Sequence, residues 1–370
     1  MANKKILYVC TVDSMIWNFL VPHIRELESS GYTVECACSS TGEIINALRD
    51  EHGLVVHEIN IKRSPVKLTN FKGLIQLINI IKKGNFDLIH AHEPVGGVIG
   101  RLAGRFCKKE VFYTAHGFHF HPGGKKLNNA IYYSIEKFMS FFTDKLFVMN
   151  NYDYKMGKKM YGENNVSLIH GVGVDIERFQ NDQSNLKERL DIRLKCNFAK
   201  NDIVIGTVAE FIPRKRYIDF LYVAQRLIKL NSNYKFLMVG TGEKLEEMKQ
   251  LAKELRITQN CIFAGYCKNV IPYFNAMDLF LFTSNQEGLP RAVMEAMAIG
   301  KPIVASKIRG NEDLIVDGVT GFLVPVGDID QYVIKIEEAL NTPDIGIKAK
   351  ERIINNFSTS KVIEEIIVEY

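Results

Sequence analysis

The sequence lacks the features of a membrane-spanning, secreted or disulfide-stabilised protein. No apolar run approaches the length that crosses a bilayer. The first residues pass directly into the short apolar run 6–10, without the longer apolar segment and cleavage site of a signal peptide. The 7 cysteines are odd in number and follow neither a disulfide framework nor a zinc spacing. We therefore expect a cytoplasmic protein whose thiols stay reduced.

Length and charge set the broad class. A chain of 370 residues is too long for one core and fits two domains of about 150–200 residues each. The net charge is +5, yet residues 1–174 hold 21 Lys and Arg against 15 Asp and Glu, whereas the remainder holds 26 against 27. The basic excess favours an anionic surface or acceptor for the first half. Nucleic acid is not the expected partner, because no motif for it is present.

Short apolar runs alternate with amphipathic segments along the chain, which predicts an α/β protein built on parallel sheets. The alternation restarts after a polar stretch, so we expect two Rossmann-like, doubly wound domains that face each other across a ligand cleft. The predicted strands are 6–12, 33–39, 54–59, 87–92, 111–116, 145–149 and 166–170 in the first half, and 203–211, 235–239, 261–264, 279–283, 302–306 and 321–324 in the second. The predicted divisions are an N-terminal Rossmann-like domain over 1–174, a linker region over 175–201, a C-terminal Rossmann-like domain over 202–345 and closing helices over 346–370.

The most informative stretch is 287–295, where Glu287 and Glu295 bracket the expected start of a buried helix. The apolar run 279–283 precedes it, and Pro290 suits the first helical turn. A helix N-terminus attracts phosphate through its N–H groups and its dipole. Carboxylates beside an anion site are useful if they bind hydroxyl groups, such as those of a sugar. The pair therefore predicts a nucleotide-sugar site.

Three patterned stretches, 287–295, 298–305 and 317–325, give the second half a family resemblance. They resemble the retaining glycosyltransferases of the GT-B fold, in the large family 4 (glycosyl transferases group 1) that contains sugar transferases for capsule, exopolysaccharide and lipopolysaccharide. Weaker similarity spans almost the whole chain, and the stretch 113–118 resembles the polysaccharide branch. The resemblance implies the GT-B fold and sugar transfer with retention at the anomeric carbon.

The resemblance also implies roles for residues around the expected helix start. Glu287 would bind hydroxyls of the donor sugar, and Glu295 would bind those of the ribose. The amides of Gly288 and Leu289 would approach the sugar and the phosphate. Without its flanking pattern, the pair of glutamates would read as a solvated helix pair.

Lys215 follows the first strand of the second half, in a basic segment with Arg214 and Arg216. Its charge could neutralise the leaving diphosphate, the role that a metal ion fills in other transferases. The alternative is a basic surface turn before a helix. Many members of the family carry an arginine where Glu210 stands, so Arg214 or Arg216 could supply the missing cation.

His116 ends the apolar run 111–116 and precedes Gly117, which permits close backbone approach. In similar enzymes the histidine at this point lies near donor sugar and acceptor, so we expect His116 to orient the reacting groups; the alternative is a buried core histidine. His119 is a weaker acceptor-side candidate. A metal site made of His116, His119 and His121 lacks any supporting carboxylate spacing, and we expect a metal-independent protein with no cofactor.

Other positions are weaker candidates. Gly240 and Gly242 form a turn after an expected strand, where the backbone could approach the nucleotide, and Tyr266 would lie near the base by family position alone. Asp13 and Ser14 follow the first strand and could contact acceptor or donor, or cap the next helix. That turn has no G-x-G-x-x-G pattern, which disfavours a nicotinamide dehydrogenase.

Asp328 and Asp330 mimic the Asp-x-Asp metal motif of a different transferase fold. A helical pattern follows them, so we expect Asp328 to be a helix N-cap rather than a manganese ligand.

The first half also carries aromatic and basic residues around a helical segment at 128–142. The spacing of the aromatic residues indicates a core, but some could face a lipid surface, because nearby basic residues would suit anionic headgroups and a polyprenyl diphosphate. These residues are Arg101, Arg105, Lys108, Lys109, Lys125, Lys126, Tyr132, Tyr133, Phe138, Phe141 and Phe142.

Together these features predict a glycosyltransferase that moves a hexose or N-acetylhexosamine from a nucleotide-diphosphate sugar, with UDP-sugar as the expected donor. The expected acceptor is a polyprenyl-diphosphate-linked glycan in bacterial capsule, exopolysaccharide or O-antigen synthesis. We expect peripheral contact with the inner face of the cell membrane through the basic first half. Two alternatives stay open: a UDP-sugar epimerase of GT-B architecture, and a non-catalytic partner that only binds nucleotide sugar in a polysaccharide assembly complex.

Overall fold

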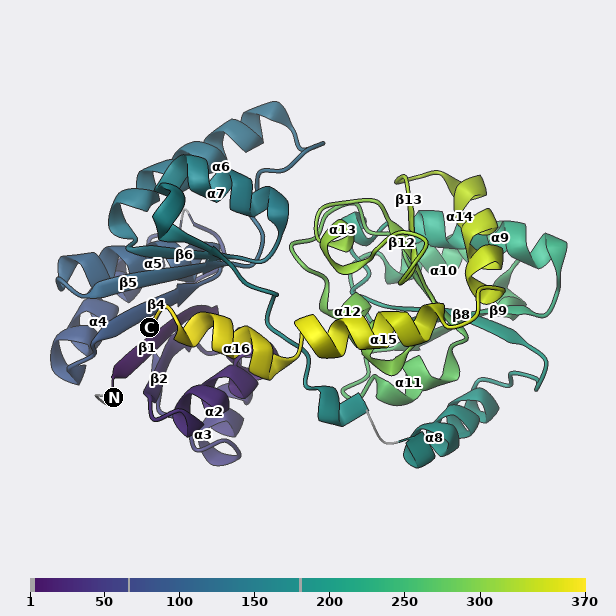
Figure 1. The fold of residues 1–370 in the computed structure, drawn as a ribbon, viewed down its shortest axis with the longest axis horizontal. Helices are drawn as coiled ribbons and strands as arrows, with labels where there is room; N and C mark the ends of the chain where they lie inside the picture. The colour runs from purple at the N-terminus through teal and green to yellow at the C-terminus, as the bar shows by residue number, and fades with distance from the viewer. Residues whose placement is uncertain (1–3, 66, 180–181) are drawn as a thin grey trace. The chain divides into compact units, whose positions relative to one another are not determined.

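The computed structural model describes residues 4–65, 67–179 and 182–370 and divides the chain into two compact units (Figure 1). The N-terminal unit comprises Met1–Gly173 and Thr359–Tyr370, and the C-terminal unit comprises Val174–Ser358. Each unit contains one parallel β-sheet with helices on both faces. Every predicted strand overlaps one strand of these sheets, which confirms the α/β fold class.

The N-terminal unit is built on a seven-stranded sheet in the order β3-β2-β1-β4-β5-β6-β7, with all neighbours parallel. Its central strands are buried on both faces, which is why they are nearly continuous apolar runs in the sequence. The strands are β1 (Lys5–Val12), β2 (Thr33–Ser39), β3 (Val56–Glu58), β4 (Leu88–His92), β5 (Glu110–Ala115), β6 (Lys145–Val148) and β7 (Val166–Leu168).

Two groups of helices cover the two faces of this sheet (Figure 1). On one face, Leu77 and Ile99 pack against Leu7 and Ile89 of the central strands. On the other face, α16, the last helix of the chain, packs against α2. The helices are α1 (Asp13–Met15), the π-helical turn η1 (Ile16–Leu20), α2 (Val21–Ser29), α3 (Ile44–Asp50), α4 (Thr69–Gly84), α5 (Pro94–Phe106), α6 (Lys126–Met139), α7 (Asn151–Tyr161) and α16 (Thr359–Ile367), with short 3-10 turns at Ser140–Phe142 and Glu163–Asn165.

The C-terminal unit is built on a six-stranded parallel sheet in the order β10-β9-β8-β11-β12-β13. The chain adds β9 and β10 on one side of β8 and then crosses back to add β11 on its other side, which reverses the direction in which strands are added. Ligands of open α/β sheets bind at such a reversal, outside the carboxyl ends of the strands. The strands are β8 (Ile203–Val208), β9 (Tyr234–Val239), β10 (Cys261–Gly265), β11 (Leu279–Phe282), β12 (Ile303–Ser306) and β13 (Phe322–Val324).

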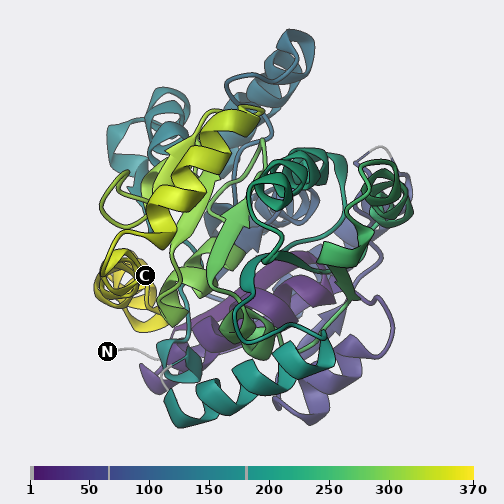
Figure 2. The same cartoon turned by 90° about the vertical axis from the view of Figure 1, so that its right-hand side faces the viewer.

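Separate apolar cores lie on the two faces of the second sheet. Helices α9, α10 and α14 cover one face, and α11, α12 and α15 cover the other; α14 and α8 lie on opposite sides of the sheet in Figure 2. The helices are α8 (Asp182–Lys195), α9 (Tyr217–Leu230), α10 (Leu245–Glu254), α11 (Ile271–Ala276), α12 (Arg291–Ile299), α13 (Asn311–Leu314), α14 (Ile329–Leu340) and α15 (Ile345–Asn356), with 3-10 turns at Ile176–Phe179, Pro213–Lys215 and Thr258–Asn260.

The structure divides the chain differently from the predicted boundaries. Residues 175–201, predicted as a linker, contain α8, which belongs to the C-terminal unit; residues 180–181 of that range lie outside the described residues. Arg189 and Arg193 hold α8 in place through Asp278, at 2.6 and 3.2 Å. The predicted closing helices separate, because α15 packs in the C-terminal unit and α16 in the N-terminal unit.

One further property concerns the helices of the described ranges. None of them is both long enough and apolar enough to cross a membrane.

Candidate active site

The candidate site of the C-terminal unit is built from two neighbouring strands. β8 and β11 pair in parallel, so the turn after β8 and the loop after β11 lie side by side at one edge of the sheet. The Asn285 amide donates to the carbonyl oxygen of Arg214 at 2.8 Å. Thr283 donates from Oγ1 to the carbonyl of Lys215 at 3.1 Å. The sheet therefore fixes the basic turn against the loop that carries Glu287.

Glu287 is the acceptor at the centre of this cluster. Its Oε1 accepts hydrogen bonds from Lys215 Nζ at 2.6 Å, from Ser284 Oγ at 2.6 Å and from Arg214 Nη1 at 2.9 Å. Its Oε2 accepts no hydrogen bond from any residue in the described ranges. One carboxylate oxygen is thus held by the protein, and the other can still accept a hydrogen bond from a ligand.

Burial and charge oppose each other at this cluster. The side chains of Glu287 and Lys215 are only 8% and 12% exposed. Burial alone would raise the pKa of the Glu287 carboxyl, but the cations of Lys215 and Arg214 outweigh it and hold this pKa below its ordinary value. Burial lowers the pKa of the Lys215 ammonium, and Glu287 opposes that shift. Two cations hydrogen-bond to the ionised Glu287, while the exposed Glu210 also acts on Lys215 through its charge; cations at this edge suit a diphosphate.

The two arginines that flank Lys215 have different partners. Arg214 joins the cluster, and its side chain is 42% exposed. Arg216 adopts a left-handed backbone conformation with φ of 49° and donates two hydrogen bonds to Asp219, at 2.6 and 2.8 Å. Glu210 is exposed. Of the two arginines, Arg214 is the one placed to supply the second cation.

Helix α12 carries the second predicted carboxylate. Pro290 has an extended ψ of 114° and is the N-cap of α12, which begins at Arg291. Glu295 is 9% exposed and accepts a hydrogen bond from Arg291 Nε at 2.8 Å. Gly288 and Leu289 form the half-buried segment between Glu287 and this helix. The chain therefore places Glu287, Gly288, Leu289 and Glu295 along one short stretch of backbone.

The glycines after β9 support the basic turn through packing. Gly240 and Gly242 have φ of 143° and 154°, and an added Cβ would lie 2.0 Å from the carbonyl oxygen of Ala209 and 2.5 Å from that of Phe211, respectively. These close approaches require glycine and hold the segment that leads to Arg214. Tyr266, on the loop after β10, is 76% exposed.

In the N-terminal unit, His116 follows β5 and lies beside the histidines of β4. His92 Nδ1 and His116 Nε2 are 3.3 Å apart, and the ring of His90 stacks on that of His92. Burial lowers the pKa of His116 to about 3 and that of His92 well below its ordinary value. His116 is therefore a neutral hydrogen-bonding group at physiological pH.

The weaker acceptor-side candidates have defined contacts as well. The buried Asp13 carboxylate accepts hydrogen bonds from the amides of Ser14 and Thr41, each at 2.8 Å, and from the Thr41 hydroxyl at 2.6 Å. These bonds tie the end of β1 to the loop before α3. The exposed His119 has its ring 5.1 Å from that of Tyr132, and both side chains line a cavity.

Comparison with known proteins identifies the family. Residues 188–358 match the model of the glycosyl transferases group 1, and residues 5–150 match that of the glycosyl transferase 4-like proteins. EpsD of Bacillus subtilis, a protein named as a glycosyltransferase, is 31% identical over 98% of this chain and 95% of its own length. The chain belongs to the glycosyl transferases group 1.

A further relative and a solved structure extend this comparison. The Escherichia coli UDP-Gal:α-D-GlcNAc-diphosphoundecaprenol α-1,3-galactosyltransferase is 26% identical over 92% of this chain and 89% of its own length. The crystal structure of Anabaena Alr3699/HepE in complex with UDP and glucose superposes with a TM-score of 0.82 at 19% identity, over 99% of each chain. The fold is therefore GT-B, and the family makes this protein a glycosyltransferase.

The sequence patterns do not single out Glu93, which lies directly after β4 at the carboxyl edge of the N-terminal sheet. Its φ of 62° and ψ of 166° form a backbone conformation that non-glycine residues rarely adopt. Its Oε2 accepts a hydrogen bond from the Thr11 amide at 2.9 Å, and burial raises the pKa of its carboxyl. A carboxylate directly after a central parallel strand was the available signal, because ligands bind at that edge of a sheet.

Asp328 lies at the N-terminus of α14. Its carboxylate accepts a hydrogen bond from the Gln331 amide at 3.1 Å and caps α14, as predicted. No group of three His, Cys, Asp or Glu side chains within residues 4–65, 67–179 and 182–370 is arranged to hold a metal ion.

Proposed function

We propose that this glycosyltransferase moves a hexose or N-acetylhexosamine from a UDP-sugar to a glycan carried on polyprenyl diphosphate, with retention at the anomeric carbon. The product would be a bacterial capsule, exopolysaccharide or O-antigen glycan, in line with the resemblance of residues 113–118 to the polysaccharide branch. No metal ion takes part in the proposed reaction.

The half-engaged carboxylate of Glu287 carries this proposal. Three donors, Lys215, Arg214 and Ser284, hold Oε1, so the carboxylate has one position and Oε2 points its unused lone pairs in a fixed direction. Hydroxyl groups of a sugar donate to such an oxygen. The neighbouring cations suit the diphosphate of the same donor molecule.

In the proposed reaction the sugar passes directly from UDP to the acceptor, without a covalent intermediate on the protein. The bond between the anomeric carbon and the diphosphate oxygen breaks, and UDP leaves with the electron pair. The acceptor hydroxyl forms the new bond on the same face of the sugar, and its proton passes to the leaving diphosphate. Lys215 and Arg214 stabilise the negative charge that develops on the diphosphate, while Glu287 and Glu295 fix the sugar and ribose hydroxyls. His116, neutral because of its burial, would orient the reacting hydroxyls.

Two observations favour a lipid-linked acceptor. The E. coli relative is named for an acceptor on diphosphoundecaprenol. In this chain, α6 and the turn after it expose large apolar side chains, as a protein that touches a membrane surface does. The most exposed are Leu127 at 73%, Phe141 at 71% and Phe138 at 60%.

Donor screening tests the proposal. UDP, UDP-glucose, UDP-galactose and UDP-N-acetylglucosamine should raise the melting temperature, and the matching GDP- and ADP-sugars should raise it less. The Glu287→Gln variant should lose most of the additional shift that the sugar provides over UDP. If none of these nucleotides changes the melting temperature of the wild type, the proposal is wrong.

Product analysis separates the alternatives. Incubation of the wild type with the stabilising UDP-sugar alone should release only slow hydrolysis products, and an epimerised UDP-sugar would instead support the epimerase. Addition of a sugar–diphosphate–lipid acceptor should give a glycosylated lipid with an α linkage if the donor is α. Donor binding without turnover on any lipid-linked acceptor would support the non-catalytic partner.

A further inference from the structure

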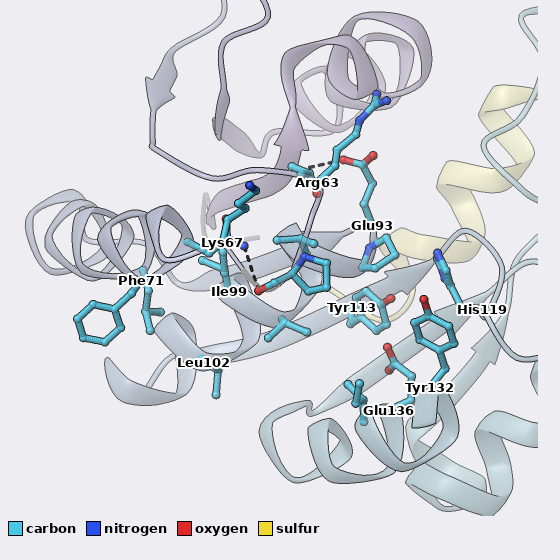
Figure 3. Close-up of a pocket in the computed structure, with 18 of the residues that line it drawn as sticks. Arg63, Lys67, Phe71, Glu93, Ile99, Leu102, Tyr113, His119, Tyr132 and Glu136 are labelled. Carbon is cyan, nitrogen blue, oxygen red and sulfur yellow. Dashed lines mark hydrogen bonds between the residues drawn. The ribbon is translucent and has the colours of Figure 1, made fainter. Parts of the chain in front are cut away.

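The N-terminal unit contains an apolar cavity that the donor site does not use. It has a volume of about 610 Å3 and lies among α4, α5 and α6, on the face of the sheet that these helices cover. One end reaches Thr11, Glu93 and Gly117, at the carboxyl ends of three adjacent strands, β1, β4 and β5. The cavity therefore runs from the expected acceptor edge of the sheet along α5 (Figure 3).

Aliphatic and aromatic side chains make up the walls of this cavity. Leu74 and Phe71 come from α4, Val98 and Leu102 from α5, and Ile135 from α6. Several of them are far from buried: Phe71 is 67% exposed and Ile135 is 44% exposed, and the neighbouring Leu68 is 91% exposed. Apolar surface gathered in a concave site marks a binding site for an apolar ligand.

Two cationic side chains also line the cavity. Arg63 and Lys67 project from the segment before α4, as Figure 3 shows, and both are exposed. Asn70 fixes this segment, because its side chain accepts from the Lys62 amide at 2.8 Å and donates to the Ser64 carbonyl at 2.9 Å. These bonds fix the backbone on either side of Arg63, and both cations belong to the lining of the apolar groove.

The acidic residues of the cavity do not cancel these cations. Glu136 pairs with the buried guanidinium of Arg101 at 3.0 Å and accepts from the Tyr161 hydroxyl at 3.0 Å. Glu93 accepts from the Thr11 amide at 2.9 Å; burial raises the pKa of its carboxyl, and the charge of Arg63 opposes that shift. The cavity lining thus carries two cations, Arg63 and Lys67, against one carboxylate, Glu93, that has no ion-pair partner of its own among the described residues, and this excess favours an anion.

We propose that this groove binds the first isoprene units of the acceptor's polyprenyl chain, with the diphosphate of that acceptor at Arg63 and Lys67. The assignment rests on the proposed function, which supplies a lipid-linked diphosphate as acceptor. It adds that the protein itself recognises the lipid, beyond any contact with the membrane surface. A peptide would fit the walls poorly, because its backbone N–H and C=O groups would be left without partners there.

Binding of the isoprenoid chain in this groove would fix the position of the acceptor sugar. A chain that lies along α5 with its diphosphate at the strand edge places the sugar beyond the diphosphate, next to Glu93 and the loop that carries His119. Acceptors that lack the isoprenoid would lose this alignment as well as the apolar contact.

Calorimetric titration with farnesyl diphosphate tests the groove. We expect Leu102→Gln and Val98→Gln each to weaken this binding about tenfold or more, because a polar group replaces apolar contact. Leu127→Gln on α6 is the matched control, since Leu127 is 73% exposed and does not line the cavity. The double variant Arg63→Gln/Lys67→Gln should weaken farnesyl diphosphate and leave farnesol binding unchanged. Two groove variants are used so that one of them carries the test if the other does not fold.

Other probes decide against the proposal. Equal binding of inorganic diphosphate and farnesyl diphosphate would overturn the apolar groove, and equal binding of dodecyl phosphate would overturn the isoprenoid assignment. A loss in Leu127→Gln as large as in Leu102→Gln would show surface adsorption instead. Thermal stabilisation by UDP-sugar, measured on every variant, separates failure of the groove inference from failure of the proposed function. If UDP-sugar stabilises the wild type but farnesyl diphosphate does not bind, only the groove inference is wrong. If UDP-sugar does not stabilise the wild type, the proposed function is wrong.

Discussion

The ammonium of Lys215 lies 2.6 Å from Oε1 of Glu287, and both side chains are almost completely buried. The two residues are 72 positions apart in the chain and meet because β8 pairs with β11. A buried ion pair of this kind is seldom a device for stability alone, because desolvation offsets much of the attraction. Its value here is positional, since the pair fixes an anion and a cation at the edge where ligands bind.

A double-mutant cycle measures this coupling. Lys215→Met leaves Glu287 buried with fewer donors, and Glu287→Gln leaves Lys215 buried without its counter-charge, so each should destabilise the C-terminal unit by about 1–5 kcal/mol. The double variant should cost less than the sum, with a coupling of about 0.5–3 kcal/mol. Urea unfolding followed by far-UV circular dichroism gives the values. Glu246→Gln, on a surface pair with Lys249, is the control and should stay within about 0.5 kcal/mol of the wild type; additive effects of the two buried variants would contradict the coupling.

The two arginines beside Lys215 should differ in donor binding. Arg214→Gln removes a cation of the Glu287 cluster and should raise the Kd for UDP about tenfold. Arg216→Gln removes the partner of Asp219 and should change this Kd by about twofold or less. Glu210→Arg, which restores the residue common in the family, should tighten UDP binding. Titration calorimetry with UDP checks all three variants. Equal losses of UDP affinity in Arg214→Gln and Arg216→Gln would show that the contact of Arg214 with Glu287 does not determine diphosphate binding.

The turn after β9 should tolerate no side chain. Gly240→Ala would place Cβ 2.0 Å from the Ala209 carbonyl oxygen at a φ of 143°, so the backbone must shift and carry the basic turn with it. We expect a loss of about 2–4 kcal/mol in stability and weaker UDP binding. Gly318→Ala is the control, because Gly318 has a φ of 73° but open space around it. Similar losses of UDP affinity in both variants would count against the proposed support of Arg214 and Lys215.

Chelation should not affect transfer. In the proposed reaction, Lys215 and Arg214 stabilise the leaving diphosphate, so EDTA at millimolar concentration should leave the rate of UDP-sugar turnover unchanged, and Mn2+ should not raise it more than about twofold. The measurement is UDP release in metal-free buffer with and without each addition. A rate that collapses with EDTA and returns with Mn2+ would require a metal at the diphosphate.

The strands were predictable because parallel strands buried on both faces are nearly continuous apolar runs. The carboxylates of 287–295 were also recognisable, since they stand out at an expected anion site. The contact of Glu287 with Lys215 was not, because strand order sets it. Arg214 rather than Arg216 contacts Glu287 because Arg216 adopts a left-handed backbone conformation, and Glu93 is strained because its φ is positive. Neither conformation leaves a pattern in the sequence.

Buried histidines should make the N-terminal unit sensitive to acid. Burial lowers the pKa of His23 from 6.5 to about 4, so between these values the unfolded chain binds a proton that the folded unit does not. Its contribution to the free energy of unfolding is therefore complete above pH 6.5 and falls as the pH drops towards 4, by up to about 1.4 kcal/mol per pH unit. His90 and His92 have pKa values lowered in the same direction and make the loss of stability with falling pH steeper.

The single tryptophan, Trp17, lies in this unit, so its fluorescence during urea unfolding at pH 7, 6 and 5 gives the slope of the unfolding free energy against pH. His23→Gln keeps a donor for the Val172 carbonyl, which His23 Nε2 contacts at 2.5 Å, and should flatten the slope by about one proton. An unchanged slope in that variant would mean that His23 titrates normally in the folded unit.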